Sequence, residues 1–211
     1  MLLAPTGRAS KRMSEGASFP ASTIHRFLKW NKENDEFMIN EYNKDSHKLI
    51  IVDEVSMLDI NLMSNLFRGL KDNIQIVFVG DYNQLPSVGC GKVLKDMIDT
   101  NLINVIYLEY LYRQDENSYI TTLAREINEN NLSENFYETK SDYTFLRVPS
   151  IGIKDAIRNI SYKLIDKGYD YKKVQFLAPM YAGINGIDSL NKELQAIFNP
   201  NDGTKNEIKI G

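Results

Sequence analysis

The sequence has little cysteine and no long apolar run. Its 211 residues include a single cysteine, Cys90, which cannot form a disulfide within the chain and fits a reducing compartment such as the cytoplasm. No stretch of the sequence approaches the run of about 18 apolar residues that a membrane-spanning helix needs, and the N-terminus lacks the apolar segment of a signal peptide. The sequence therefore predicts a cytoplasmic protein with no membrane partner.

The chain also lacks a strong overall charge, although one segment is basic. The formal net charge is -3, which gives no global sign of nucleic-acid binding. Residues 4–32, however, contain six Lys or Arg and one acidic residue, together with His25, Phe27 and Trp30. Cations interleaved with aromatic rings suit single-stranded nucleic acid, because cations follow the backbone and rings stack on bases. The alternative is that Phe27 and Trp30 belong to the core, which we favour for Phe27 and leave open for Trp30.

Two adjacent carboxylates follow an apolar run at the centre of the sequence. Leu49–Val52 is typical of a parallel strand covered on both faces, and Asp53 and Glu54 come directly after it. Ligands of α/β proteins bind beyond the carboxyl ends of such strands. In a nucleotide hydrolase the first acid can hold Mg²⁺ and the second can activate a water molecule. The alternative is that both acids cap the next helix.

Polar groups also follow the other expected strands. Residues 1–4 lead into Pro5, Thr6, Gly7 and Arg8, and residues 74–79 lead into Gly80 and Gln84. Residues 105–108 lead into Arg113, which could reach phosphate oxygens or could form only a surface ion pair. A glutamine at a strand end could sense a terminal phosphate or position a water molecule. The strand ends together predict one composite site.

The remaining elements follow from apolar periodicity and turn residues. We expect a β-hairpin within residues 31–48, turning near Asn34 and Asp35, and further strands at 143–148 and 173–178. Helices are expected at residues 9–15, 23–30, 59–70, 91–100, 119–130, 154–167 and 187–198. Two helices have predicted inward faces, made of Leu62, Met63, Leu66, Phe67 and Leu70 in one and of Ile157, Ile160, Leu164 and Ile165 in the other.

These segments, taken together, resemble the RecD-like branch of superfamily 1 DNA helicases, which comprises the exodeoxyribonuclease V alpha subunit and stand-alone relatives. The resemblance rests on residues 4–9, 23–26, 51–57, 79–81, 84–89, 112–114 and 177–180, with Gly183, Gly186, Leu190 and Asn191. It implies an α/β fold, a RecA-like P-loop NTPase sheet with helices on both faces. It also implies a first motor domain at residues 1–30 and 49–145, a pin-like β-hairpin insertion at 31–48, and the beginning of a second RecA-like domain at 146–211.

The resemblance implies a role for each matched residue. Asp53 would help to hold Mg²⁺, Glu54 would be the catalytic base for ATP hydrolysis, and Arg113 would stabilise the transferring phosphoryl group. Gln84 would couple the γ-phosphate to DNA contacts. The predicted contacts with single-stranded DNA are Pro5, Thr6, Gly7, Arg8, Thr23, His25, Pro179 and Met180. Such helicases move 5′ to 3′, and the resemblance leaves open whether the partners include other subunits of a helicase–nuclease complex.

One departure from this family matters most. The sequence contains no G-x-x-x-x-G-K-[ST] loop, which would cradle the phosphates and supply a Ser or Thr to Mg²⁺. We therefore expect an internal fragment of a helicase that hydrolyses ATP negligibly by itself. Two alternatives remain, a single-strand-binding module without motor activity and a nucleotide hydrolase that does not act on nucleic acid.

Overall fold

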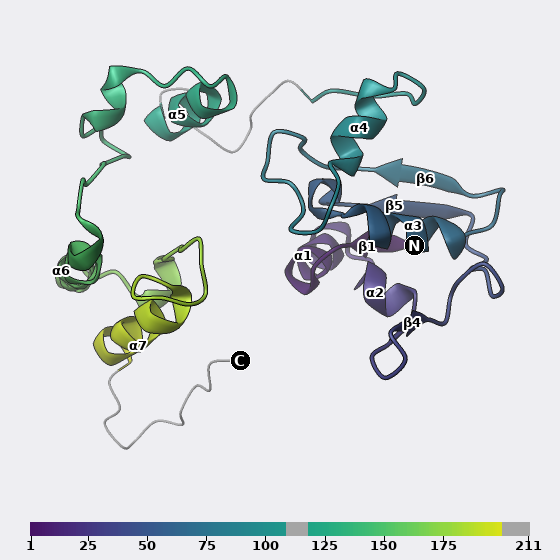
Figure 1. Ribbon diagram of the computed structural model, residues 1–211, viewed down its shortest axis with the longest axis horizontal. Helices are drawn as coiled ribbons and strands as arrows, with labels where there is room; N and C mark the ends of the chain where they lie inside the picture. The colour runs from purple at the N-terminus through teal and green to yellow at the C-terminus, as the bar shows by residue number, and fades with distance from the viewer. Residues whose placement is uncertain (109–117, 200–211) are drawn as a thin grey trace. The chain divides into compact units, whose positions relative to one another are not determined.

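The computed structural model describes residues 1–108 and 118–199, so the predicted site residue Arg113 lies outside the described residues. The chain divides into two compact units, Met1–Arg113 and Gln114–Gly211, and each is described by itself. The first unit contains a parallel sheet with helices, and the second contains helices and short 3-10 turns (Figure 1).

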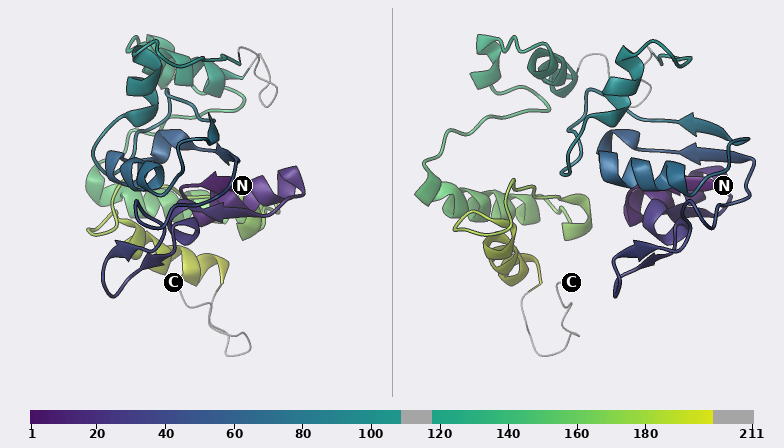
Figure 2. Two further views of the ribbon diagram at one scale, coloured as in Figure 1. Left: turned by 90° about the vertical axis from the view of Figure 1, so that its right-hand side faces the viewer. Right: turned by 45° about the vertical axis from the view of Figure 1, so that its right-hand side comes forward.

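A four-stranded parallel sheet forms the centre of the first unit. Its strands are β1 (Leu2–Ala4), β2 (Ala21–Thr23), β5 (Leu49–Val52) and β6 (Gln75–Phe78), in the spatial order β2-β1-β5-β6. β1 pairs with β2 and β5, and β5 pairs with β6. Figure 2 shows the strands of this unit as purple to blue arrows in two further views. β2 is not predicted from the sequence, because Ala21–Thr23 is short and only weakly apolar, and Thr23 begins the helix expected at residues 23–30.

The two faces of this sheet are covered unequally. Leu3, Ile50 and Val52 share one face by register and are fully buried. On the other face, Leu49 and Val77 remain 42% and 41% exposed. Coverage of β5 is therefore complete on one face and partial on the other, where Ile51 is half-buried.

Helices nevertheless lie on both sides of the sheet. The crossover through α1 (Gly7–Ala17) leads from β1 to β2, toward one edge of the sheet, and the crossover through α3 (Ile60–Arg68) leads from β5 to β6, toward the other. Because parallel crossovers are right-handed, opposite directions place the two helices on opposite faces. The predicted α/β sheet with helices on both faces is confirmed.

α3 shows why the sequence specified this helix well. Asp59 caps its N-terminus, with Oδ1 accepting a hydrogen bond from the backbone N–H of Leu62 at 2.8 Å, and Gly69 follows its last residue. Four of the five predicted inward residues are buried: Leu62, Met63, Leu66 and Leu70. The prediction was wrong for Phe67, which is 47% exposed and contacts the Phe78 ring with an edge-to-face centroid distance of 6.1 Å.

The predicted hairpin is present but short. β3 (Trp30–Asn31) pairs antiparallel with β4 (Glu36–Phe37), and Asp35 in the turn has a left-handed backbone with φ 53°. The helix before it, α2 (Ile24–Phe27), is shorter than predicted, because Lys29 also adopts a left-handed conformation. Phe27 is buried, as expected for a core residue, whereas Trp30 is 42% exposed.

The strand predicted at residues 105–108 is absent from the structure. After α4 (Val93–Asp99), the chain is irregular through residue 108, and the side chains of Ile106 and Leu108 are almost fully exposed. An apolar run favours a strand only when a neighbouring strand accepts its backbone hydrogen bonds. Among residues 1–108, no strand lies beside β6 on the side away from β5.

The second unit contains the predicted helices without the predicted strands. Its α-helices are α5 (Tyr119–Asn128), α6 (Ile153–Asp166) and α7 (Ile187–Phe198), and 3-10 turns lie at Glu134–Tyr137, Ser150–Gly152 and Tyr171–Lys173. Residues 143–148 and 174–178 are irregular, so the strands predicted at 143–148 and 173–178 are wrong. Both runs lack a paired strand within the described part of this unit.

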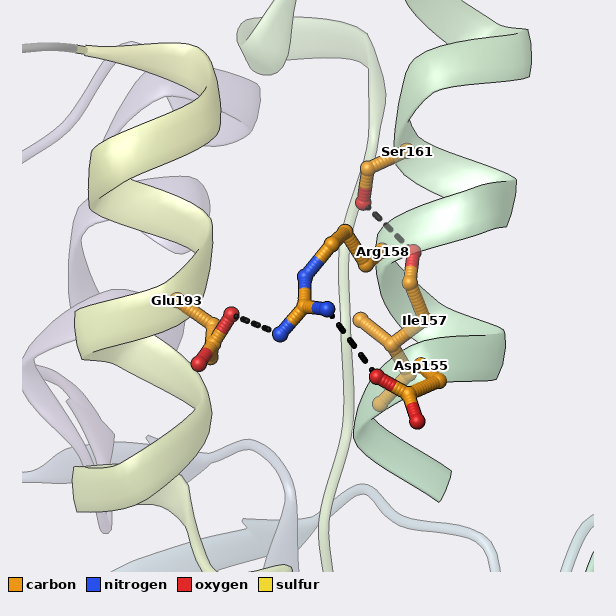
Figure 3. A network of polar contacts seen from close by, with 5 residues as sticks. All are labelled: Asp155, Ile157, Arg158, Ser161 and Glu193. Carbon is orange, nitrogen blue, oxygen red and sulfur yellow. Dashed lines mark hydrogen bonds and ion pairs between the residues drawn. The ribbon is translucent and has the colours of Figure 1, made fainter. Parts of the chain in front are cut away.

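An arginine connects α6 to α7. The Arg158 guanidinium donates hydrogen bonds to Asp155 in its own helix and to Glu193 in α7, each at 3.0 Å (Figure 3). The pKa of Arg158 is raised above its ordinary value, and the largest cause is the hydrogen bond to Glu193. Ser161 lies on the same helix and is fully buried, its hydroxyl donating to the Ile157 carbonyl. Of the predicted inward residues, Ile157, Ile160 and Leu164 are half-buried, and the prediction was wrong for Ile165, which is exposed.

Candidate functional site

The carboxyl ends of all four strands meet at one edge of the first unit. Since the sheet is parallel, the residues that follow β1, β2, β5 and β6 emerge on the same side. The structure thus brings together four predicted segments: Pro5–Arg8, Thr23 with His25, Asp53 with Glu54, and Gly80 through Gln84. This edge of the sheet is the candidate site.

Asp53 and Glu54 occupy a sharp turn after β5. The backbone N–H of Asp53 donates to the Leu3 carbonyl at 2.9 Å, and that of Val55 donates to the Val79 carbonyl at 3.0 Å, so strands on both sides hold the turn. Glu54 has a left-handed backbone with φ 54° and ψ 41°, an unfavourable conformation for a residue with a side chain. Asp53 Oδ1 accepts a bond from the Glu54 N–H, and both residues are half-buried.

These two carboxylates do not cap a helix. Glu54 precedes the 3-10 turn η1 (Val55–Met57) but makes no side-chain capping bond to it. The longer helix α3 already has its cap in Asp59. The capping alternative is therefore wrong, and the Glu54 side chain is free of this structural role.

A close backbone approach connects β6 to the same turn. A Cβ atom on Gly80 would lie 3.0 Å from the Val55 nitrogen and 3.2 Å from the Ser56 nitrogen, so only glycine fits without a shift. Beyond it, Asp81 accepts hydrogen bonds from the Asn83 N–H at 3.0 Å and from the Gln84 side-chain amide at 3.4 Å. Gln84 is exposed and held beside this turn.

Gln84 borders a shallow hollow that sequence analysis did not anticipate. The hollow has a volume of about 140 Å³, and its lining is Ser56, Tyr82, Gln84, Pro86, Lys92, Leu94 and Lys95. The Ser56 hydroxyl is buried there without a hydrogen-bond partner. Ser56 and the two lysines were not predicted as site residues, although Ser56 belongs to a matched segment and lysines after a glycine-rich turn are a usable signal. The hollow joins Gln84 to the turn that carries Glu54.

The segment after β1 begins a helix. Thr6 is the N-cap of α1, and its Oγ1 accepts a hydrogen bond from the Ala9 N–H at 3.2 Å. Gly7 faces open space and Arg8 is exposed in the first turn. The Arg8 side chain makes no ion pair within the described residues, whereas Lys11 lies 4.0 Å from Glu15. Arg8 is therefore available for an anionic ligand.

The segment after β2 repeats this arrangement. Thr23 caps α2, its Oγ1 accepting a hydrogen bond from the Arg26 N–H at 3.2 Å. His25 is exposed, and its ring lies 5.9 Å from the Trp30 ring and 5.9 Å from the Phe37 ring. The hydroxyls of Thr6 and Thr23 thus have local structural roles, and the nearby Arg8 and His25 side chains face solvent.

The remaining predicted residues lie elsewhere. Pro179 and Met180 belong to the second unit and are exposed, and the Met180 carbonyl accepts a hydrogen bond from the Ile187 N–H at the start of α7. Gly186 fits closely there, because a Cβ on it would lie 2.4 Å from the Tyr181 carbonyl oxygen. Arg113 lies outside the described residues, as stated above.

The acidic residues suit a magnesium ion that is shared with a phosphate. Within residues 1–108 and 118–199, no group of three or more His, Cys, Asp or Glu side chains could form a metal site by itself. Mg²⁺ commonly takes one or two carboxylates and completes its shell with water and substrate phosphates. Only one Asp53 oxygen is occupied by the Glu54 N–H, so the donor set fits this arrangement.

No described helix is both long and apolar enough to cross a membrane.

The chain matches the AAA domain family over residues 1–145. It is 33% identical over 202 residues to the ATP-dependent RecD2 DNA helicase of Deinococcus radiodurans, covering 96% of this chain and 27% of that protein. It is also 27% identical over 210 residues to the RecBCD enzyme subunit RecD of Buchnera aphidicola from Schizaphis graminum, covering 82% of this chain and 35% of that protein.

These curated relatives are thus much longer than the chain, which spans about a quarter to a third of their lengths. Among solved structures, the chain is similar to the Pif1 helicase from Bacteroides in complex with ADP-AlF3 and single-stranded DNA. That likeness has a TM-score of 0.43 and 17% sequence identity, and it covers 84% of this chain and 52% of the other. The sequence resemblance to RecD-type helicases is confirmed by the curated relatives.

Proposed function

Because this chain belongs to the AAA domain family, we propose that it is a segment of an ATP-dependent 5′–3′ DNA helicase of the RecD type, acting in recombination and repair. The observation that carries the proposal is the single sheet edge where four matched segments emerge. Acidic groups for nucleotide chemistry follow β5, and exposed Arg8 and His25 follow β1 and β2 at the same edge. A motor that couples ATP hydrolysis to movement along DNA needs both kinds of group within one rigid element.

On the nucleotide side, the proposed roles are those that the resemblance implies, and the positions of Asp53, Glu54 and Gln84 support them. Asp53 would hold Mg²⁺, which neutralises charge on the phosphates when bound. Glu54 would accept the proton of the attacking water, and its freedom from capping supports this role. Gln84 would hydrogen-bond the terminal phosphate, since its turn adjoins that of Glu54. Arg113 would stabilise the transferring phosphoryl group.

On the DNA side, the proposal assigns single-stranded DNA to residues 5–8, Thr23 and His25, and to Pro179 and Met180 of the second unit. Arg8 is exposed and would neutralise a phosphate. The proposed domain division is a first motor domain at 1–30 and 49–145, a pin-like hairpin at 31–48, and the start of a second RecA-like domain from 146. A cytoplasmic location and partners within a helicase–nuclease complex belong to the same proposal.

The absence of a G-x-x-x-x-G-K-[ST] loop from these 211 residues limits what the chain can do by itself. Without the backbone cradle and lysine of that loop, ATP would be bound weakly. We expect negligible ATP turnover by the isolated chain, with or without DNA. Robust DNA-stimulated phosphate release by the isolated chain would contradict the assignment.

A chimera tests the proposed function directly. This chain would replace the matching segment of the Deinococcus radiodurans RecD2 helicase, to which it is similar over 96% of its length. We expect DNA-stimulated ATP hydrolysis by the chimera and its loss, by a factor of at least about a hundred, on Glu54→Gln. Glu41→Gln, at an exposed position in the hairpin region, is the matched control and should leave turnover unchanged. Full turnover by the Glu54→Gln chimera would show that another group is the base.

A further inference from the structure

Three aromatic rings gather where the hairpin meets α2. The rings of His25 and Trp30 make an edge-to-face contact with centroids 5.9 Å apart, and the His25 ring lies 5.9 Å from the Phe37 ring. Trp30 and Phe37 are paired across β3 and β4. The three residues come from separate segments, so the hairpin has to form before the rings can meet.

The cluster is firmly held although it faces solvent. The indole Nε1–H of Trp30 donates to Asp35 Oδ1 at 3.1 Å, and this bond connects β3 to the turn. At the hairpin base, the Ile39 N–H donates to the Leu28 carbonyl at 3.1 Å, and both side chains are buried in the core. Trp30 itself remains 42% exposed, and His25 is also exposed. A packed base therefore presents a preorganised aromatic surface to solvent.

Two cations adjoin this cluster along the chain, on the side of α2. Arg26 follows His25 and Lys29 precedes Trp30; both are exposed, and neither has an ion-pair partner within the described residues. Lys32 is also exposed but lies in the hairpin turn. The acidic side chains nearby, Glu33, Asp35 and Glu36, lie toward the hairpin turn, and Asp35 is engaged by the Trp30 indole. A polyanion would therefore approach from the α2 side.

We propose that His25, Trp30 and Phe37 form a stacking platform for an unpaired nucleobase of single-stranded DNA, with Arg26 and Lys29 on the neighbouring phosphates. This inference rests on the proposed function and assigns the base-contacting surface. Stacking suits a motor that must hold any sequence, since every base has a π-face. Cations alone would bind the backbone without distinguishing a strand that carries bases from one that lacks them.

The chain provides its own probe, because Trp30 is its only tryptophan. We would titrate the 211-residue chain with an oligothymidylate of about 15 nucleotides and with an abasic oligomer that carries the same phosphates. Stacking predicts quenching of Trp30 fluorescence by the first oligomer and not by the second. Trp30→Ala should weaken oligothymidylate binding about tenfold and leave abasic binding unchanged, and Trp30→Phe should restore most of the loss.

Tyr42→Ala is the matched control, because Tyr42 is a highly exposed aromatic side chain after the same hairpin and outside the ring cluster. If Trp30→Ala does not fold, Phe37→Leu removes a second ring, and wild-type quenching needs no variant. Salt-dependent binding of oligothymidylate without quenching, and with equal affinity for the abasic oligomer, overturns the platform and leaves the proposed function standing. Failure of both oligomers to bind at low salt overturns DNA binding and the platform together.

Discussion

Gly80 lies so close to Val55 that a Cβ atom on Gly80 would be 3.0 Å from the Val55 backbone nitrogen. The same nitrogen donates its hydrogen to the Val79 carbonyl, one residue before Gly80. The turn after β5 and the end of β6 therefore share one backbone contact. This contact fixes the carboxylates after β5 relative to the loop that carries Gln84.

Gly80→Ala should destabilise the first unit through this contact. The added methyl group would also meet Leu94 Cδ2 at 2.9 Å, so both a backbone and a packed side chain would have to move. We expect a loss of about 1–3 kcal/mol in the free energy of unfolding, measured by urea denaturation. Gly7→Ala is the matched control, because its Cβ would meet nothing within 4 Å. Equal effects of the two substitutions would contradict the close approach.

Asp59→Ala should cost about 1 kcal/mol by removing the N-cap of α3. Its carboxylate accepts the Leu62 N–H at 2.8 Å, and no other side chain caps this helix. Asp59→Asn should retain most of the stability, because asparagine caps almost as well. Circular dichroism during urea unfolding would measure both. A stable Asp59→Ala variant would show that the cap contributes nothing.

Glu54→Gly should raise stability although it removes the proposed catalytic base. Glu54 has φ 54° and ψ 41°, a conformation that costs an L-residue about 1–2 kcal/mol and costs glycine little. We expect the free energy of unfolding to rise by up to about 1 kcal/mol. The rise is smaller than the relieved strain, because glycine has more conformational freedom in the unfolded chain and this offsets part of the gain. Ser18→Gly, at φ 49°, is a matched control outside the site. A destabilised Glu54→Gly variant would mean that the Glu54 side chain contributes to the fold.

Local signals in the sequence specified the helices well, and non-local requirements explain the errors. α7 has the predicted bounds, and α6 is shifted by one residue at each end, because a helix satisfies its backbone within itself. The strands predicted at 105–108, 143–148 and 173–178 are absent, because a strand needs a partner that its own residues do not encode. β2 was missed for the converse reason: three weakly apolar residues become a strand only beside β1.

The candidate site was predictable as a set of strand ends rather than as a geometry. Parallel strands place Asp53 and Gln84 at one edge, so their grouping followed from the pattern. The left-handed Glu54, the Gly80 contact and the ring cluster around Trp30 depend on tertiary packing, and no spacing rule reveals them.

The second unit should respond to acid through Asp142. The pKa of Asp142 lies below its ordinary value of 3.8. The largest cause is the hydrogen bond that its carboxylate accepts from the Ser118 hydroxyl at 2.6 Å. A lowered folded-state pKa gives a stability contribution that is present above pH 3.8 and lost as the pH falls through the folded-state value. Ser118→Ala should move the Asp142 pKa back toward 3.8, measured by NMR titration of its carboxyl carbon. Ser133→Ala, whose hydroxyl bonds Glu126, should leave that titration unchanged.

Arg8→Gln should weaken single-stranded DNA binding in a salt-dependent way. Arg8 is exposed in the first turn of α1, at the sheet edge where the proposed DNA contacts gather. Loss of one phosphate contact should reduce the slope of log K against log salt concentration by about 0.7 for a single strand, measured by fluorescence anisotropy. Lys71→Gln removes another exposed cation, which lies before β6 at the opposite edge of the sheet, and should leave the slope unchanged. If both substitutions lower the slope equally, the binding follows total charge rather than this edge, and the proposed DNA contact of Arg8 is wrong.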